Sequence, residues 1–375
     1  MRILFSDTKH NILSVKEDKR AELMNWGLDN SFPSLIENLF SMSVTGSAAL
    51  DKASKALFAG GVTAQFAELQ LNSEFHTLND LLAEASKQLI QQGNVFIHIG
   101  YNELLEVASL KVIPATNIRV GKTDSKKYSG KFLVYDNFDK SKGKISLDKF
   151  IKIDKYNPLK EVIQAQIDKA GNISNYNGQI LHLKNELNSV YGMPKVNSIL
   201  SELLLESNSQ IFRSKGAESG FLNTKLLVTK PFNTDYERQA FKHQLNSLKG
   251  ANSTGQVLVL ESSTATEDLN QQLKMEDLSS KFDDKLFEYS DSQARNNICI
   301  ALGVPKMLID NSDSGLFGNS GELLKQARIE LHNSLNVERG LLLRVFKMLL
   351  SNYKDEINIQ ELTIIDNLNL QNDAA

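Results

Sequence analysis

The sequence has a single cysteine, Cys299, among 375 residues. One cysteine excludes an intrachain disulfide framework and a zinc site built from several cysteines. Long apolar runs are also missing, because residues 341–350 are interrupted by Arg344 and Lys347, and no stretch approaches the ~20 apolar residues of a membrane span. The first five residues are MRILF, after which the chain turns polar. We therefore expect no signal peptide, and a reducing, cytoplasmic setting.

Charge of one sign is not in excess either. The chain has 42 lysines and arginines and 45 acids, which gives a net charge of −3. A protein that simply coats nucleic acid would be strongly basic, so that class is disfavoured. The composition, 41% hydrophobic and 23% charged, is that of a folded protein. The length predicts two or three structural units.

Catalytic motifs are missing from the sequence. The Gly-Lys-Thr at 121–123 matches the end of a phosphate-binding loop, but Thr116 stands where the first glycine belongs. Neither His-Glu-x-x-His nor Gly-x-Ser-x-Gly occurs. His98 and His182 lie in predicted strands without partners spaced for a metal, and we interpret them, like Cys299, as core residues. We therefore predict no catalytic residue, no metal and no cofactor.

The hydrophobic periodicity predicts an α+β fold, with helices followed by a block of strands in the first half of the chain. Gly60-Gly61 and Gly93 follow two of the predicted helices as stop signals. The predicted helices are a segment after Pro33, Val44–Phe58 and Thr77–Gln92, and the predicted strands are 95–99, 107–113, 132–135, 150–153 and 179–183.

In the second half, two long helices flank a small β-α-β module. Pro194 opens the first, which ends near 216–220, and the second, with a capping box at Ser280 and Asp283, ends at the Gly-Val-Pro of 303–305. The module has predicted strands at 225–229 and 256–261 and a helix at 234–248. A third long helix is predicted from about Glu322 to Tyr353, and a possible strand at 361–365. The module should project on a two-helix stalk, whose helices carry more apolar surface than one chain can cover.

Five motifs stand in a fixed order along the chain. They are WGLDNSFP at 26–33, YGMP at 191–194, IFRSKGA at 211–217, a glycine-rich turn at 250–255 before the strand at 256–261, and RNNICIALGVP at 295–305. Together they resemble the portal proteins of tailed bacteriophages, in the short class found in many long-tailed phages. The resemblance covers about residues 24–350.

The resemblance implies a portal fold with a wing, a two-helix stem, an inserted small α/β clip and a short C-terminal crown. The implied parts are the N-terminal wing region 1–193, the first stem helix 194–219, the clip 220–276, the second stem helix 277–304, the tunnel loop 305–321, the long wing helix 322–350 and the short crown or tail 351–375. In this family the subunits form a ring, usually a dodecamer, at one capsid vertex.

The resemblance also implies functional surfaces, on three parts of the chain. The expected DNA-channel residues of the tunnel loop are Lys306, Asn311, Ser314, Leu316, Phe317 and Asn319; those of the stem are Lys281 and Lys285; and the expected docking residues of the clip are Lys242, His243 and Lys249. Twelve chains of charge −3 suit a conduit in which duplex DNA slides, because a channel that neutralised many phosphates would hold the DNA.

The implied partners are further copies of the chain, the major capsid protein, the terminase large subunit, a head-tail connector or adaptor protein, and double-stranded DNA passing through the channel, with no membrane. The implied location is the virion, after assembly in the host cytoplasm. Two other functions stay open. One is a metal-dependent DNA-processing enzyme, for which Asp136 and Asp154 are the crude candidates; the other is a monomeric adaptor or scaffold protein.

Overall fold

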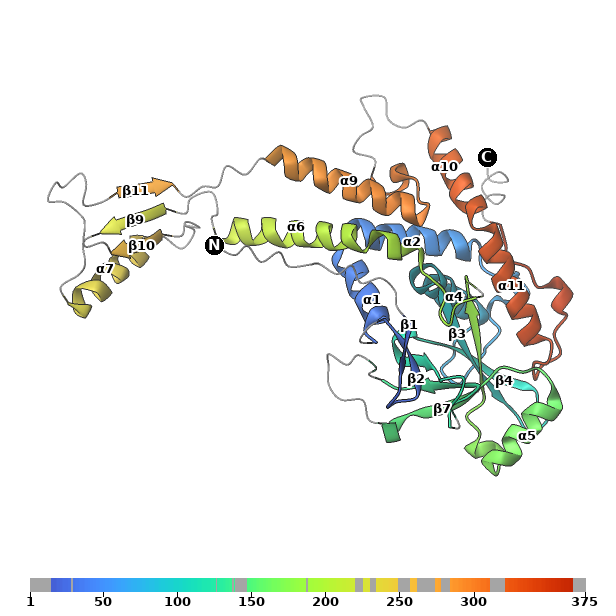
Figure 1. The fold of residues 1–375 in the computed structure, drawn as a ribbon. Coiled ribbons are helices and arrows are strands. Elements are labelled where there is room, and N and C mark those ends of the chain that lie inside the picture. The colour runs from blue at the N-terminus through green and yellow to red at the C-terminus, as the bar shows by residue number, and fades with distance from the viewer. Residues whose placement is uncertain are drawn as a thin grey trace. The chain divides into compact units, whose positions relative to one another are not determined.

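The computed structural model describes residues 15–27, 30–125, 127–136, 138, 147–186, 188–219, 225–229, 234–248, 257–261, 274–277, 284–310 and 321–366. They belong to two compact units (Figure 1). We call the first, Met1–Leu203 with Arg295–Ala375, the body, and the second, Leu204–Ala294, the inserted unit. Helices and antiparallel strands in separate stretches confirm the expected α+β class.

Local signals set the helices at the start of the body. Helix α2 (Val44–Phe58) begins at Ser43, whose hydroxyl accepts a hydrogen bond from the Gly46 amide at 2.8 Å. Helix α4 (Leu78–Gln92) begins with a capping box between Thr77 and Asp80, and ends at Gly93 in the left-handed region, with φ +66°. The predictions for these two helices are confirmed. The other helices here are α1 (Phe32–Met42) and the short α3 (Ala64–Ala67).

A six-stranded sheet in the order β4-β3-β8-β7-β6-β5 forms the centre of the body. Its strands are β3 (Asn94–Tyr101), β4 (Val107–Ile113), β5 (Ile118–Val120), β6 (Lys131–Val134), β7 (Ile151–Lys155) and β8 (Gln179–Lys184). All neighbours are antiparallel except β7 and β8, which are parallel. A parallel pair needs a crossover, and α5 (Lys160–Ala170) lies between these strands in the chain. The sequence analysis predicted neither α5 nor β5, and it also missed the hairpin of β1 (Val15–Asp18) and β2 (Leu23–Trp26).

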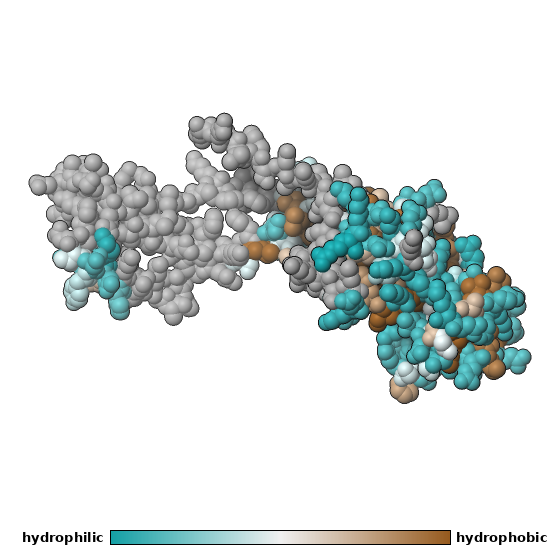
Figure 2. Space-filling model, turned by 60° about the horizontal axis from the view of Figure 1, so that its bottom comes forward, coloured by the Kyte–Doolittle hydropathy of each residue, from teal (hydrophilic) through white to brown (hydrophobic). Residues whose placement is uncertain are grey.

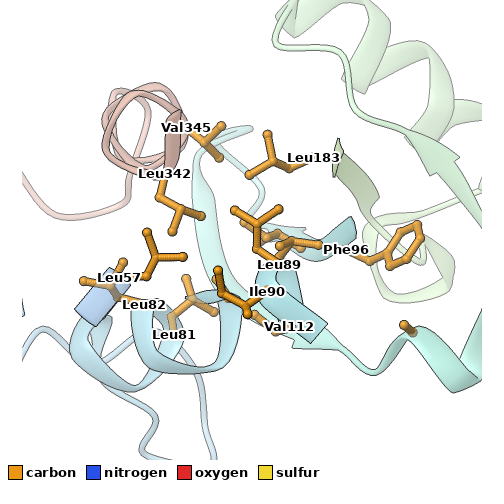
Figure 3. Packing of buried hydrophobic residues seen from close by; sticks show 14 of the residues in the cluster. Leu57, Leu81, Leu82, Leu89, Ile90, Phe96, Val112, Leu183, Leu342 and Val345 are labelled. Carbon is orange, nitrogen blue, oxygen red and sulfur yellow. The ribbon is translucent and has the colours of Figure 1, made fainter. Parts of the chain in front are cut away.

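The main core lies where α2, α4 and a later helix, α11 (Asn336–Leu350), meet the sheet. Figure 3 shows side chains from these elements converging on one another. The labelled residues are Leu57, Leu81, Leu82, Leu89, Ile90, Phe96, Val112, Leu183, Leu342 and Val345. This core joins segments from both ends of the chain, so the body is one folding unit despite the insertion within it.

The prediction of one helix from Glu322 to Tyr353 is wrong, because the structure has two helices, α10 (Gly321–Ser334) and α11, that separate at Leu335. The guanidinium of Arg339 explains the break. It donates to the carbonyl oxygens of Ala56 at 2.8 Å and His332 at 3.1 Å. The His332 carbonyl also accepts from the Leu335 amide, at 3.3 Å, so the helical bond pattern changes at this turn.

The predicted strand at 361–365 is also wrong as a regular strand. This segment forms an isolated bridge, Val62 to Ile364, after the short 3-10 turn Ile359–Glu361. Backbone bonds from Thr63 to the oxygen of Thr363 and from Ile365 to Gly61 hold it against the turn that follows α2. Residues 351–366 therefore pack on the body, and their assignment to a crown stays a prediction.

The inserted unit has a three-stranded sheet in the order β10-β9-β11. Strand β9 (Lys225–Thr229) pairs in parallel with β10 (Val257–Glu261), and α7 (Asp235–Leu248) connects them. These elements confirm the predicted module, while β11 (Lys274–Asp277), antiparallel to β9, was missed. Helix α6 (Leu200–Ser219) leads into this unit and α9 (Asp284–Leu302) leads out of it. The helix predicted to open at Pro194 first forms a 3-10 turn, Lys195–Ile199.

Candidate functional site

Two of the sequence motifs meet at one aromatic contact in the body. Trp26 and Tyr191 stack with their ring centroids 4.3 Å apart. The Tyr191 hydroxyl donates to the carbonyl oxygen of Met24 at 2.7 Å and accepts from the Val120 amide at 2.9 Å. Burial raises the pKa of Tyr191 to about 12, so this hydroxyl stays protonated. The contact anchors the turn that precedes α6.

Asn94, at the start of β3, makes four hydrogen bonds beside that contact. Its amide nitrogen donates to the carbonyl oxygens of Gln92 at 2.7 Å and Gly192 at 2.9 Å. Its Oδ1 accepts from the Gly192 amide at 2.7 Å and lies 2.8 Å from Nε2 of His182. Gly192 passes so close to the oxygen of Gly93 that a Cβ would lie 2.2 Å from it. This node joins β3, β8 and the entry to α6.

The two histidines of the sheet have backbone or side-chain partners. The His182 ring stacks on Phe96, with centroids 4.3 Å apart, and burial lowers its pKa to about 3. Nε2 of His98 lies 2.7 Å from the oxygen of Asn177. Asp154 forms an ion pair with Lys131 at 2.6 Å. In the described parts of the chain no group of three or more His, Cys, Asp or Glu side chains is placed to hold a metal ion.

Helices α6 and α9 contact each other in the inserted unit through polar side chains. The Arg213 guanidinium lies 2.7 Å from the Asp291 carboxylate. Asp291 is buried, and so are Glu206 and Ser207 on α6. Buried charge between two helices stabilises little when the cost of desolvation is counted.

Four large apolar side chains of the same two helices are exposed. The exposed fractions are 48% for Leu204, 41% for Leu205, 40% for Ile211 and 66% for Tyr289. In a helix pair that is complete by itself, apolar residues face inward and charged residues face water. Among the described residues of α6 and α9 these four apolar side chains face outward, although Leu203 and Ile298 on the same helices are buried, so we interpret the exposed apolar faces as contact surfaces.

The channel residues expected from the sequence lie partly outside the described residues. Lys306 begins a short 3-10 turn, Lys306–Leu308, which follows α9 after Gly303, a residue with φ +68°. Asn311, Ser314, Leu316, Phe317 and Asn319 lie outside the described residues. Lys281 also lies outside them, and Lys285 is in the first turn of α9. Their roles stay predictions.

The docking residues expected on the inserted unit lie on or next to α7. Lys242 and His243 are in this helix and His243 is exposed, whereas Lys249 falls outside the described residues. The sequence analysis missed Tyr236, which is 82% exposed and stands seven residues, about two helical turns, before His243. An exposed tyrosine in a helix is the residue type enriched where protein partners bind. Its position in the helical pattern could have drawn attention to it.

No protein-family model and no curated protein matches the sequence. The structure is similar to a chain in the neck of the native gene transfer agent particle, computed with C12 symmetry: TM-score 0.55, 14% identity, covering 92% of this chain and 87% of that one. It is also similar to a chain in the neck of the empty particle, computed with C6 symmetry. The TM-score is 0.53 and the identity 15%, and the alignment covers 90% of this chain and 87% of that one. An HK97-family phage portal protein from Corynebacterium diphtheriae aligns at a TM-score of 0.40 and 10% identity, with 78% and 84% covered.

The chain therefore shares its fold with a chain from the neck of the gene transfer agent particle. The similarity extends over nearly the whole chain, so it includes the body and the inserted unit. No helix in the described ranges is both long and apolar enough to cross a membrane.

Proposed function

We propose that this chain is the portal protein of a tailed bacteriophage. It forms a ring at one vertex of the capsid, passes DNA during packaging and ejection, and joins head to tail. The observation that carries the proposal is the fold shared with a particle-neck chain over 92% of the sequence. The five sequence motifs in their fixed order support the same family independently of that fold.

The exposed apolar side chains of α6 and α9 support assembly into a ring. Leu204, Leu205, Ile211 and Tyr289 leave apolar surface on α6 and α9 that a single chain does not cover. A ring in which each subunit places one such face against its neighbour would bury this surface without leaving an open end. The ring has twelve subunits in this proposal, and C12 is the symmetry used for the similar neck.

In this assignment α6 and α9 are the stem, and the module between them is the clip. The body is the wing, with α10 and α11 as its long, interrupted helix, and residues 305–321 are the tunnel loop. Lys281, Lys285 and the loop residues from Lys306 to Asn319 face the DNA. Leu316 and Phe317 provide an apolar tip, which touches DNA without holding phosphates.

The clip is the docking surface for the terminase and, later, for the connector protein. Its helix α7 exposes Tyr236 and His243, and Lys242 and Lys249 add positive charge. The capsid protein contacts the wing. The protein acts as a conduit rather than a catalyst, is assembled in the host cytoplasm and remains in the virion.

Particle mass in solution tests the proposal. Mass photometry of the purified chain should give a species near twelve times 41.9 kDa, or about 500 kDa, and negative-stain images of it should show rings with a central hole. A folded species of 41.9 kDa at every concentration, with no larger form, would refute the portal assignment and favour the monomeric adaptor.

A further inference from the structure

A pocket opens on the surface of the body among the helices α1, α2 and α4. Its volume is about 500 Å³, which lies in the range of pockets that bind small ligands. Each helix contributes one face to it, because the lining residues on a helix are spaced three or four positions apart. They include Glu37 and Phe40 of α1, Leu50 and Ser54 of α2, and Lys87 and Gln91 of α4. We name this site the three-helix pocket.

The buried part of the lining contains a hydroxyl group without a partner. Phe40 and Leu50 are buried and apolar, whereas Ser54 and Gln91 are polar and only 9% exposed. Oγ of Ser54 has no hydrogen-bond partner among the described residues. A buried polar group that lacks its hydrogen bond costs free energy. A ligand that donates a hydrogen bond to this oxygen would remove that cost.

The outer part of the lining is charged, with an excess of acid. Glu37 is half-buried, Asp51 and Lys87 are exposed, and all three line the pocket, which gives a net charge of −1. The Asp51 carboxylate accepts from Nζ of Lys55 at 2.8 Å. An exposed pair of this kind contributes little, and a carboxylate can accept from several donors at once. The charge of the pocket therefore favours a cation over an anion.

The hydrogen-bond acceptors of the pocket come from all three helices. The Glu37 carboxylate is on α1, the Asp51 carboxylate and the Ser54 hydroxyl are on α2, and the Gln91 side-chain carbonyl is on α4. A guanidinium group carries five N–H donors in one rigid plane, whereas an ammonium is a compact charge with three. The planar group is the better match for acceptors on several walls. Its methylene stem can lie along the apolar part of the lining.

We propose that the three-helix pocket binds an arginine side chain of a different protein. Arginine is one of the residue types that most often anchor a protein contact in a pocket. On the face of the body that Figure 2 shows, hydrophilic side chains cover more of the described surface than apolar ones do, which suits a charged anchor. The proposed subunit contact uses α6 and α9, so the arginine is assigned to another protein. Only this source, and not the pocket, rests on the proposed function.

Saturation-transfer difference NMR of the full-length protein tests the pocket, because the method reports weak ligands of large particles. The probe is N-acetyl-arginine methylamide, with the citrulline and lysine analogues for comparison. The citrulline analogue has the same shape without the charge. The pocket variant is Glu37→Gln with Asp51→Asn, and a second variant is Lys87→Gln. The matched control, Glu161→Gln with Asp355→Asn, neutralises two exposed acids of the body outside the pocket.

The arginine probe should bind at least tenfold more tightly than the citrulline analogue, and more tightly than the lysine analogue. Two partly exposed ion pairs correspond to about a tenfold loss of affinity in the pocket variant. Lys87→Gln should tighten binding about twofold to fivefold, because it removes a repulsive charge, and the control should bind as wild type does.

Equal binding of the citrulline probe, or equal losses in the pocket variant and the control, would overturn the proposal. Weaker binding in Lys87→Gln would overturn it too, because it would show an anion site. Particle mass is read in the same samples and should not change in the pocket variant. Loss of the larger species in that variant alone would refute the assignment to a different protein and give the arginine to a second copy. The probe binds within one subunit, so its result stands whether or not rings form.

Discussion

Truncating the outward face of α6 should weaken ring assembly without unfolding the subunit. The variant is Leu204→Ala, Leu205→Ala and Ile211→Ala. Alanine has the highest helix propensity, so α6 itself is not destabilised. Burying a whole leucine or isoleucine side chain contributes about 1.5–3 kcal/mol. Because 40–48% of each residue is still accessible, each can add about 1 kcal/mol when a neighbouring subunit covers it.

Three such residues give about 3 kcal/mol per subunit contact, and 1.4 kcal/mol is a factor of ten in an association constant. The concentration at which rings dissociate should therefore rise by about 100-fold, which mass photometry across a dilution series measures directly. The matched control, Phe75→Ala, Leu104→Ala and Leu159→Ala, removes three exposed apolar side chains from the body. An unchanged ring in the α6 variant, or an equal loss in the control, would show that the exposed apolar face of α6 is not a contact surface.

Three further predictions concern other parts of the chain. Gly192→Ala should lower the stability of the body by about 1–3 kcal/mol, because the added methyl group overpacks the site. Gly340→Ala should have no such effect, because the space around Gly340 is open. Urea unfolding, followed by the fluorescence of the single tryptophan, compares the stabilities of the two variants. The pKa of His182 is about 3 in the folded body and about 6.5 in the unfolded chain, so the unfolded chain binds more protons between these two pH values. The free energy of unfolding should therefore fall as the pH drops from 6.5 toward 3, and it should fall less in the His182→Gln variant. Replacing Leu316 and Phe317 with serine should leave rings intact but impair DNA packaging or retention, and normal packaging would contradict the tunnel-loop assignment.

The elements predicted with correct bounds are those whose ends are set locally. Helix α2 is bounded by Ser43 and by the Gly60-Gly61 turn, and β4 and β9 are alternating or apolar runs between turn residues. Such signals lie within a few residues of the element they define. The sequence therefore predicted these elements and the inserted module in the order that the structure describes.

Several of the elements that were missed depend on contacts far along the chain. The break at Leu335 needs Arg339 to reach the carbonyl oxygen of Ala56, nearly three hundred residues away. Strand β5 has only three residues, and β11 exists as a strand because it pairs with β9. Periodicity in one segment does not encode such partners.

The candidate site was predictable only in part for the same reason. Leu204 and Ile211 belong to an apolar stripe that is visible in the sequence, but the side of α6 that faces outward is fixed by α9. The half-exposed Arg213 on α6 pairs with the buried Asp291 on α9. Which face of α6 is exposed depends on residues of two helices that are far apart in the sequence, so the pattern within one helix does not predict it.

The hydrogen bonds of Asn94 have a mechanical consequence for the proposed function as a DNA conduit. Gly192 stands two residues before Pro194 and the turn that becomes α6, and its amide and carbonyl are both bound to the Asn94 side chain. Tension applied along the start of α6 is therefore delivered to β3, in the interior of the six-stranded sheet, and through His182 to β8. Several hydrogen bonds of the sheet would have to shear at once before this attachment yields. In the proposed portal, the body would thus take up the recoil of the moving DNA at a point far stiffer than a surface loop.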